Sequence, residues 1–290
     1  IITLTVFEDC SGLVSVPNSP QTLTVTNSCG FSSLNSITLP VLSYADEISQ
    51  VCYPQIPNTT CNGGSLPGIL KHIYSDTINP ITLPGNCNDW TIFWDGCCRN
   101  TAVNLANHDG YYFEAVINNS NSQCNSSPII GSNPVPYNCI NIPVTYNFQV
   151  SEPDGDSLYY SFITASEVQF GGTGSVPVAY NGGYSPTNPI NGISLDPNTG
   201  EINFTPTIQG AFVVVVKIEE FDSSGTSLGY IMQDFQFQII TQNCINSPPS
   251  IPVSPLINFS GSAIYLGGNA IQACEGDSVC FDVEFLDVDP

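Results

Sequence analysis

The chain has 290 residues and a formal net charge of −22, because only three basic residues stand against 25 acidic ones. Without a basic patch it cannot release counterions from phosphates, so nucleic acid is excluded as a partner and an anionic membrane surface is disfavoured. Charged residues nevertheless make up only 10% of the chain and hydrophobic residues 41%, which is typical of a folded protein and not of an acidic disordered tail. The length allows two or three domains.

Residues 1–137 form the first predicted region, in which short runs of alternating apolar and polar residues are separated by proline and glycine. Such alternation predicts half-buried strands. The segment Gly68–Tyr74 has helical spacing, but it is short and follows Pro67, so we predict a strand there as well. The other predicted strands are Ile2–Phe7, Thr22–Thr26, Ser36–Leu39, Trp90–Trp94 and Tyr111–Ile117.

The cysteines predict disulfides formed in an oxidising compartment. Zinc is the rival explanation, but there is no C-x₂-C pair and neither histidine is spaced as a ligand near a cysteine pair. Adjacent Cys97 and Cys98 are expected to reach different partners. Eight of the cysteines precede residue 137 and can pair among themselves, which favours a domain boundary there. The predicted disulfide cysteines are Cys10, Cys29, Cys52, Cys61, Cys87, Cys97, Cys98, Cys124, Cys139, Cys244, Cys274 and Cys280.

Residues 138–245 form the second predicted region, and its pattern is that of an all-β sandwich. A bond between Cys139 and Cys244 would tie its two ends together. Asp196–Gly200 reads as a tight turn in which Gly200 takes a positive φ. The apolar run Ala211–Ile218 predicts a strand that is buried on both faces. The other predicted strands are Val144–Val150, Leu158–Phe162 and Gln233–Ile240.

An acidic turn lies between two of these strands and carries carboxylates at alternate positions, Glu152, Asp154 and Asp156. Oxygen donors on an irregular loop suit a hard cation, so we predict Ca²⁺ bound here with Asp222 from a neighbouring turn. Glu220 and Asp234 are further candidate ligands. The alternative is a solvated Asp-Gly turn that binds no metal.

The acidic turn has a counterpart near the end of the sequence. Cys274 precedes Asp287 by the same distance as Cys139 precedes Glu152. We therefore expect residues 246–290 to contain a proline-rich linker and the truncated start of a further similar module. Tandem modules favour a stalk or filament over an enzyme. Because the chain begins inside a strand-like run, it is expected to be a segment of a longer protein.

Four spaced motifs of the second region resemble those of a cadherin-like or putative-Ig (He_PIG-type) module. They are Asp154–Ser161, Leu195–Gly200, Thr205–Gly210 and Asp222–Gly225. The resemblance covers about a third of the chain and implies tandem, disulfide-stapled Ig-like or cadherin-like β-sandwiches. In such modules carboxylates bind calcium at module junctions, although Glu152 stands where aspartate is commoner.

The cysteine-rich region resembles the part that precedes such modules in very large surface proteins of Bacteroidota, on the residues Trp90, Trp94, Cys97–Asn100, Glu114 and Asn125–Pro128. Those proteins resemble the SprB-type gliding adhesins, which the type IX secretion system exports. The resemblance implies an extracellular, cell-surface adhesin whose partners are surfaces or glycans, the motility or anchoring machinery and neighbouring modules. It also implies O-glycosylation within Asp-Ser/Thr-apolar triplets, at Thr77, Ser157 and Ser278.

We expect no enzymatic activity, because no nucleophile elbow, zinc-protease or phosphate-loop motif is present. His108-Asp109 reads as part of a turn. Trp90, Trp94 and Tyr111-Tyr112 are better explained as core than as a sugar-binding platform. The main alternative to an adhesin is a purely structural stalk, filament or surface-layer protein. An accessory region of a carbohydrate-active enzyme is less favoured.

Overall fold

The computed structural model describes residues 1–12, 15–51, 53–76, 81–106, 110–120, 124–133, 137–168, 174–241, 256–267 and 270–284. The chain forms two units, Ile1–Thr241 and Gln242–Pro290. Strands dominate both units, which confirms the all-β prediction. The helical elements of the described residues are two short 3₁₀ helices, η1 (Tyr53–Asn58) and η2 (Thr60–Asn62). No helix in the described ranges is long and apolar enough to cross a membrane.

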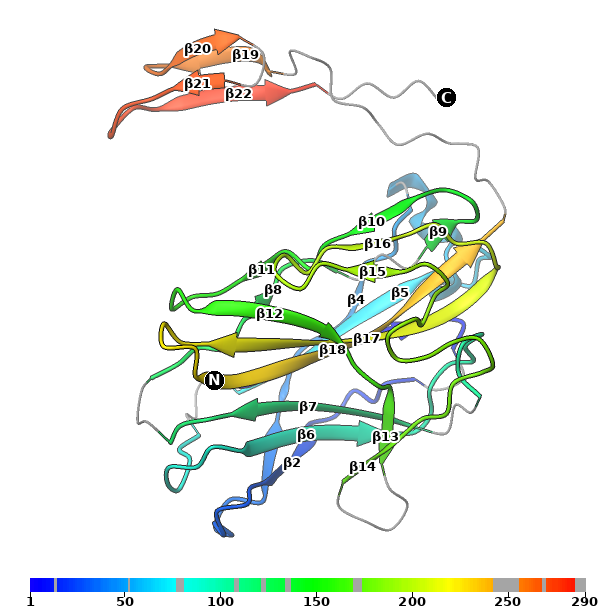
Figure 1. Ribbon diagram of the computed structural model, residues 1–290. Coiled ribbons are helices and arrows are strands. Elements are labelled where there is room, and N and C mark those ends of the chain that lie inside the picture. The colour runs from blue at the N-terminus through cyan, green and yellow to red at the C-terminus, as the bar shows by residue number, and fades with distance from the viewer. Residues whose placement is uncertain are drawn as a thin grey trace. The chain divides into compact units, whose positions relative to one another are not determined.

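One long sheet runs through the first unit (Figure 1). Its strands follow the order β12-β17-β18-β7-β6-β2-β3, and β9 pairs with the far end of β18. They are β12 (Ser157–Phe162), β17 (Gly210–Phe221), β18 (Ser227–Ile240), β7 (Tyr111–Ile117), β6 (Trp90–Gly96), β2 (Gln21–Thr26), β3 (Ser36–Leu39) and β9 (Tyr137–Cys139).

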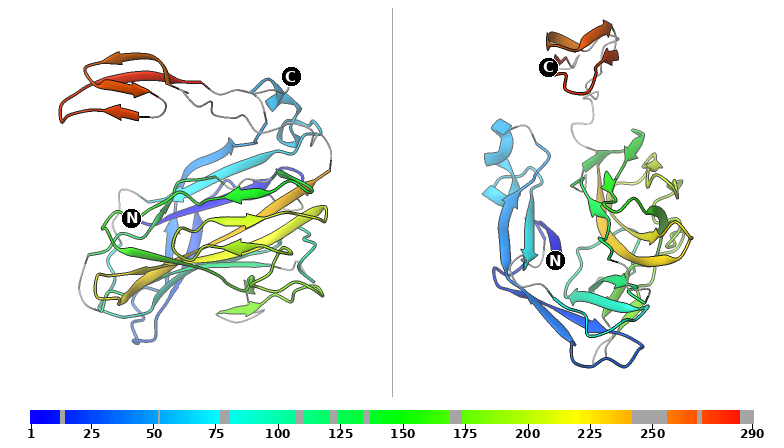
Figure 2. Two further views of the ribbon diagram at one scale, coloured as in Figure 1. Left: turned by 45° about the horizontal axis from the view of Figure 1, so that its top comes forward. Right: turned by 90° about the vertical axis from the view of Figure 1, so that its left-hand side faces the viewer.

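Smaller sheets cover the two halves of this long sheet. In Figure 2 the blue and cyan strands of the β1-β5-β4 sheet lie on one side of the unit, and the green-to-yellow strands of the β10-β16-β15 sheet lie on the other. Two strand pairs, β8-β11 and β13-β14, complete the unit. These strands are β1 (Thr3–Asp9), β4 (Val41–Glu47), β5 (Ile69–Ser75), β8 (Ile129–Ile130), β10 (Val144–Tyr146), β11 (Val150–Ser151), β13 (Ser166–Val168), β14 (Ser175–Pro177), β15 (Ser194–Leu195) and β16 (Ile202–Phe204).

Each half has its own hydrophobic core. The first is built around Trp90 and Tyr74, which are fully buried between β5, β6 and β2. The second is built around Phe148 and Phe237, which are buried between β17, β18 and the β10-β16-β15 sheet. Each of the two smaller sheets therefore buries a hydrophobic core against the long sheet, as two-layer β architectures require.

Strand β17 is buried on both faces, as its unbroken apolar run predicts. Alternate residues from Phe212 to Ile218 enter the larger core. Val213 and Val215 point the other way and pack against Ala102 and Leu105, which precede β7 in the chain. A segment of residues 1–137 therefore covers one face of β17, a strand that belongs to residues 138–245.

The structure does not separate residues 1–137 from residues 138–245. The two regions share the long sheet, because β18 pairs with β7 over Gly229–Ile231 and Ala115–Ile117. The expected boundary near residue 137 therefore differs from the observed one. Sequence patterns indicate where strands lie, but they do not reveal which distant strands pair.

The second unit consists of two antiparallel strand pairs in its described part, β19-β22 and β20-β21. All five residues of β22 are exposed. The predicted repeat of the acidic turn, Asp287–Asp289, lies outside the described residues. The strands are β19 (Leu256–Gly261), β20 (Ile264–Gly267), β21 (Ala270–Gln272) and β22 (Val279–Val283).

Disulfides staple the first core. Cys10 bonds Cys61, and Cys29 bonds Cys87. Cys139 is also disulfide-bonded, whereas its predicted partner Cys244 lies outside the described residues, as does Cys52.

Five cysteines differ from expectation. Cys97 and Cys98 bond each other, whereas each was expected to bond a different partner. Cys124, Cys274 and Cys280 are free thiols on exposed residues. Cysteine spacing alone does not show which thiols approach one another in the fold, so these pairings were beyond the sequence.

Replacing Cys29 and Cys87 by serine is expected to lower the free energy of unfolding by about 4 kcal/mol, because the bond closes a long loop in the unfolded chain. The two residues are 58 positions apart. Urea unfolding of the oxidised chain measures the difference. The matched control replaces Cys97 and Cys98, which are adjacent and so close almost no loop. An equal loss in both variants would contradict the loop-entropy explanation.

Candidate metal centre

The acidic turn and the end of β17 meet because β12 and β17 are antiparallel neighbours. Ser157 pairs with Phe221 and Leu158 with Glu220, so the residues just before β12 lie beside the last residues of β17. Glu220 falls on the face of β17 that enters the larger core, two positions beyond Ile218. Its carboxylate is therefore carried into the interior, and the residue is only 2% exposed.

Three carboxylates converge at this place. Glu152, Asp154 and Glu220 each offer an oxygen, and these oxygens lie within 4.8 Å of one another. The turn orients the Glu152 carboxylate with two backbone hydrogen bonds. The amide of Asp154 donates to Glu152 Oε1 at 3.0 Å, and the amide of Asp156 donates to Glu152 Oε2 at 2.6 Å. The cluster is thus held partly by the turn's own backbone.

A further segment of chain, residues 124–130, closes the cluster. Ser126 donates its backbone amide to Asp154 Oδ2 at 2.6 Å. The side-chain amide of Asn125 donates to Glu220 Oε2 at 2.8 Å. The second bond places the Asn125 side chain beside Glu220, which nothing in the sequence pattern indicated.

Two buried oxygens of the cluster have no hydrogen-bond partner among the described residues. They are Glu220 Oε1 and Asn125 Oδ1. Buried polar atoms are nearly always paired, and leaving one unpaired costs about 1–3 kcal/mol, more for a charged group. The fold therefore presents two unsatisfied acceptors beside two further carboxylates.

Burial and neighbouring carboxylates raise the pKa of acidic groups in and beside the cluster. Burial raises the pKa of Glu220 to about 7; the Asn125 hydrogen bond opposes this increase, and the neighbouring Glu152 and Asp156 carboxylates add to it. Desolvation, then Glu152, Asp154 and Asp222, also raise the pKa of Asp156.

The basic residues of the chain are engaged elsewhere. Lys217 pairs with Glu219 at 2.7 Å, Arg99 pairs with Asp234, and Lys71 reaches Asn133. The cluster therefore has no protein cation as a partner within the described residues.

The structure distinguishes among the predicted ligands. Glu152 and Asp154 lie in the cluster with Glu220. Desolvation raises the pKa of Asp156, which lies close enough for the charges of Glu152 and Asp154 to raise it further. Asp222 instead caps its own turn, where its Oδ1 accepts hydrogen bonds from Ser224 and Thr226. These bonds lower its pKa, the Ser224 hydroxyl most of all.

Asp234 is not a candidate ligand, because both of its oxygens accept from Arg99 at 2.6 and 2.7 Å. A second group of potential ligands, Cys29, Cys87 and Asp89, is also unsuited to a metal because its two sulfurs are joined in a disulfide.

The aromatic residues considered as a sugar platform lie in the core. Trp90 is fully buried and Trp94 is 7% exposed. The Trp90 indole donates to the Gly85 carbonyl at 3.0 Å, and Trp94 stacks on Tyr111. The core interpretation is therefore correct for both tryptophans.

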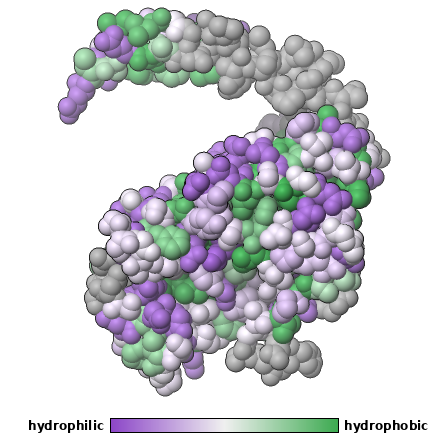
Figure 3. Space-filling view, viewed as in Figure 1, coloured by the Kyte–Doolittle hydropathy of each residue, from purple (hydrophilic) through white to green (hydrophobic). Residues whose placement is uncertain are grey.

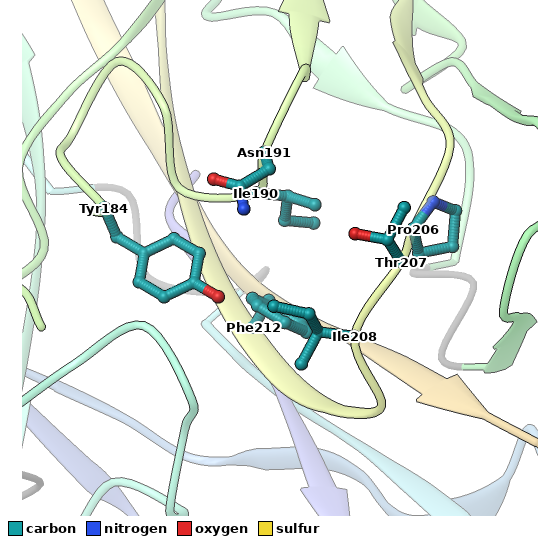
Figure 4. Close-up of a pocket in the computed structure, with 7 residues that line it drawn as sticks. All are labelled: Tyr184, Ile190, Asn191, Pro206, Thr207, Ile208 and Phe212. Carbon is teal, nitrogen blue, oxygen red and sulfur yellow. The ribbon is translucent and has the colours of Figure 1, made fainter. Parts of the chain in front are cut away.

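Two pockets of the described residues are lined by neither acidic residues, histidine nor cysteine. A cavity of about 10 Å³ lies at the edge of the larger core, large enough for about one water molecule (Figure 4). A wider surface hollow is lined by residues such as Thr145 and Asn203. His108 and Asp109 lie outside the described residues.

Two of the predicted glycosylation sites are described. Ser157 and Ser278 are both on the surface, and the Ser157 hydroxyl donates to the Phe221 carbonyl at 3.2 Å. Thr77 lies outside the described residues.

Comparison with known proteins gives one informative similarity. No protein-family model matches the chain. The sequence is similar to integrin beta-like protein A of Dictyostelium discoideum, with 26% identity over 211 residues. The aligned part is 70% of this chain but only 9% of the length of that protein. The chain thus corresponds to a small portion of a much longer relative.

Proposed function

We propose that this chain is part of an extracellular cell-surface protein that acts in adhesion. The similarity to integrin beta-like protein A carries the proposal, because the aligned part covers most of the chain and that protein is named for an adhesion receptor. The disulfides support an extracellular place of work, since such bonds persist in oxidising environments.

The surface chemistry of the first unit agrees with such a role. Only three residues are basic, and all three are engaged with partners in the chain. On the face drawn in Figure 3, hydrophilic and intermediate residues cover most of the first unit and hydrophobic residues occupy small areas. A hydrophilic surface on a chain with only 10% charged residues suits glycans or other extracellular surfaces, bound through hydrogen bonds. Gliding over a substratum after type IX export is the specific form of adhesion that the sequence resemblance suggests.

A structural stalk or surface-layer protein is the second candidate function. It is favoured by the Pro-rich stretch 247–252 followed by a second small β unit, an order typical of tandem modules. Under this alternative the modules only provide length, and binding to a surface is absent.

Deleting the gene for the whole protein in its source cells distinguishes the two functions. The adhesin proposal predicts loss of attachment and spreading with an intact envelope, and restoration by the wild-type gene. In addition, the purified 290-residue chain should compete for attachment when added to wild-type cells, while the same chain unfolded by reduction should not. A normal attachment rate with an altered envelope would favour the structural alternative and overturn adhesion.

A further inference from the structure

We propose that Glu152, Asp154, Glu220 and the side-chain carbonyl of Asn125 bind a single calcium ion. The inference goes beyond the adhesive role and does not rest on it. It depends on two observations that are independent of each other, the convergence of three carboxylates and the presence of buried oxygens without partners.

The separation of the carboxylates fits one shared ion. Calcium coordinates oxygen at about 2.3–2.6 Å, so ligands on opposite sides of it are about 5 Å apart. The oxygens of Glu152, Asp154 and Glu220 all lie within 4.8 Å of one another, which places a common centre within reach of each. Without a cation, three negative groups at this separation repel one another.

The burial of Glu220 distinguishes this cluster from ordinary surface carboxylates. Exposed acidic groups are solvated by water, whereas Glu220 is only 2% exposed and its Oε1 has no hydrogen-bond donor among the described residues. Asn125 Oδ1 is likewise buried and unpaired, and its amide nitrogen already binds Glu220. A single cation would satisfy both acceptors at once. No side chain of the described residues donates to either of them.

The donor atoms select the class of metal. Three carboxylates and an amide carbonyl form an all-oxygen set, which suits Ca²⁺ or Mg²⁺ and not zinc or copper. Calcium tolerates irregular geometry and accepts six to eight oxygens, whereas Mg²⁺ requires a near-ideal octahedron. Ligands drawn from a turn, a strand end and a separate segment favour calcium, with water or Asp156 completing the shell.

A bound ion would tie three separate pieces of chain together. Asn125 belongs to the segment leading to β8, Glu152 and Asp154 belong to the turn between β11 and β12, and Glu220 is the last residue but one of β17. Of these contacts, the Ser126–Asp154 and Asn125–Glu220 hydrogen bonds already exist without metal. Calcium would therefore stiffen this end of the sheet rather than create its fold.

Calorimetric titration of the EDTA-treated 290-residue chain tests the site. In physiological salt, which screens the surface charge, we expect saturable binding of one Ca²⁺, weaker binding of Mg²⁺, and a higher Tm with Ca²⁺ than with EDTA. Glu220→Gln should weaken Ca²⁺ binding at least tenfold, while the Tm of the metal-free protein should stay the same or rise because a buried charge is removed. Asp154→Asn, in the exposed turn, should also weaken binding.

Glu219→Gln is the matched control. Glu219 precedes Glu220 on β17, carries the same charge and pairs with Lys217 on the other face of the strand. Its replacement should leave Ca²⁺ affinity within about threefold of wild type. Equal affinity of the Glu219 and Glu220 variants would show binding to the acidic surface in general and would overturn the site. The absence of saturable binding, or tighter binding of Mg²⁺, would also overturn it.

Discussion

Replacing Arg99 by alanine is expected to destabilise the first unit by about 3–5 kcal/mol, because it leaves the Asp234 carboxylate buried without a counter-charge. The two side chains are 6% and 4% exposed, and Arg99 Nη1 lies 2.7 and 2.6 Å from the two Asp234 oxygens. Urea unfolding of the wild-type and variant chains measures the loss.

Besides its ion pair with Asp234, Arg99 donates to two backbone carbonyls. Its Nε donates to the Gly110 carbonyl and its Nη2 to the Ser166 carbonyl, both at 3.2 Å. The guanidinium therefore holds together the start of β7, the β13 hairpin and β18. Arginine suits this position better than lysine, because its planar group donates in several fixed directions.

Two controls separate the buried pair from charge loss in general. Lys217→Ala removes the same charge from a pair that is 26% and 22% exposed, and it should cost less than about 1 kcal/mol. The double replacement Arg99→Met with Asp234→Leu removes both charges and should recover most of the loss. Equal costs for Arg99→Ala and Lys217→Ala would show that burial of Asp234 is not the source of the effect.

The elements of the fold could be predicted from sequence where a pattern is local. The strand Tyr111–Ile117 has the predicted bounds, and the tight turn at Asp196–Gly200 has Gly200 at a φ of 70°. The segment Gly68–Tyr74 has helical spacing, yet Ile69–Ser75 form a strand, as predicted. In each case the local alternation of apolar residues, or the need for a positive φ, decides the conformation.

Local patterns do not predict where one predicted strand divides into two that pair with different strands. The run Val144–Val150 reads as one strand, but it splits into β10 and β11, which pair with different neighbours. The break is an Asx turn in which Asn147 Oδ1 accepts from the Gln149 amide, and Gln149 takes a φ of 51°. The alternation of apolar residues continues through the break, so the sequence pattern does not indicate where β10 ends.

In the candidate site, too, the sequence predicts the local features but not the contacts between distant segments. The alternating carboxylates marked the turn as a place for a cation, and Glu152 and Asp154 do converge there. Asp222 was expected as a ligand because its turn lies nearby, yet it is a capping residue. Asn125 carried no metal signal, since its position depends on a segment that enters from outside the predicted module.

A fragment of residues 138–241 is expected to lack cooperative unfolding, whereas residues 1–241 should unfold in a single transition. The fragment loses Ala102 and Leu105, which cover Val213 and Val215 on the second face of β17. Exposing two buried valines costs about 1.5–3 kcal/mol each, and an unpaired Asp234 adds about 3–5 kcal/mol. These losses are comparable with the whole stability of a typical domain, about 5–15 kcal/mol.

Asn104 adds a specific reason for this expectation. Its side chain is fully buried and bonds the backbone of Val213 in both directions, accepting from the amide at 3.0 Å and donating to the carbonyl at 2.7 Å. It also donates to the Pro189 carbonyl at 3.0 Å. The Asn181 amide donates to the Asn104 carbonyl at 3.0 Å, so removing residue 104 would leave four backbone groups of the second region without their present partner.

Thermal unfolding followed by circular dichroism, with hydrogen exchange on β17, measures the difference between the fragments. The control is residues 1–241 against the 290-residue chain, because the second unit forms its own strand pairs. Its removal should shift the Tm of the first unit by no more than a few degrees. A fragment 138–241 that melts sharply near the Tm of residues 1–241 would show that the second region folds alone. The shared sheet would then join two independent domains, and the pairing of β18 with β7 would act as an interface between them.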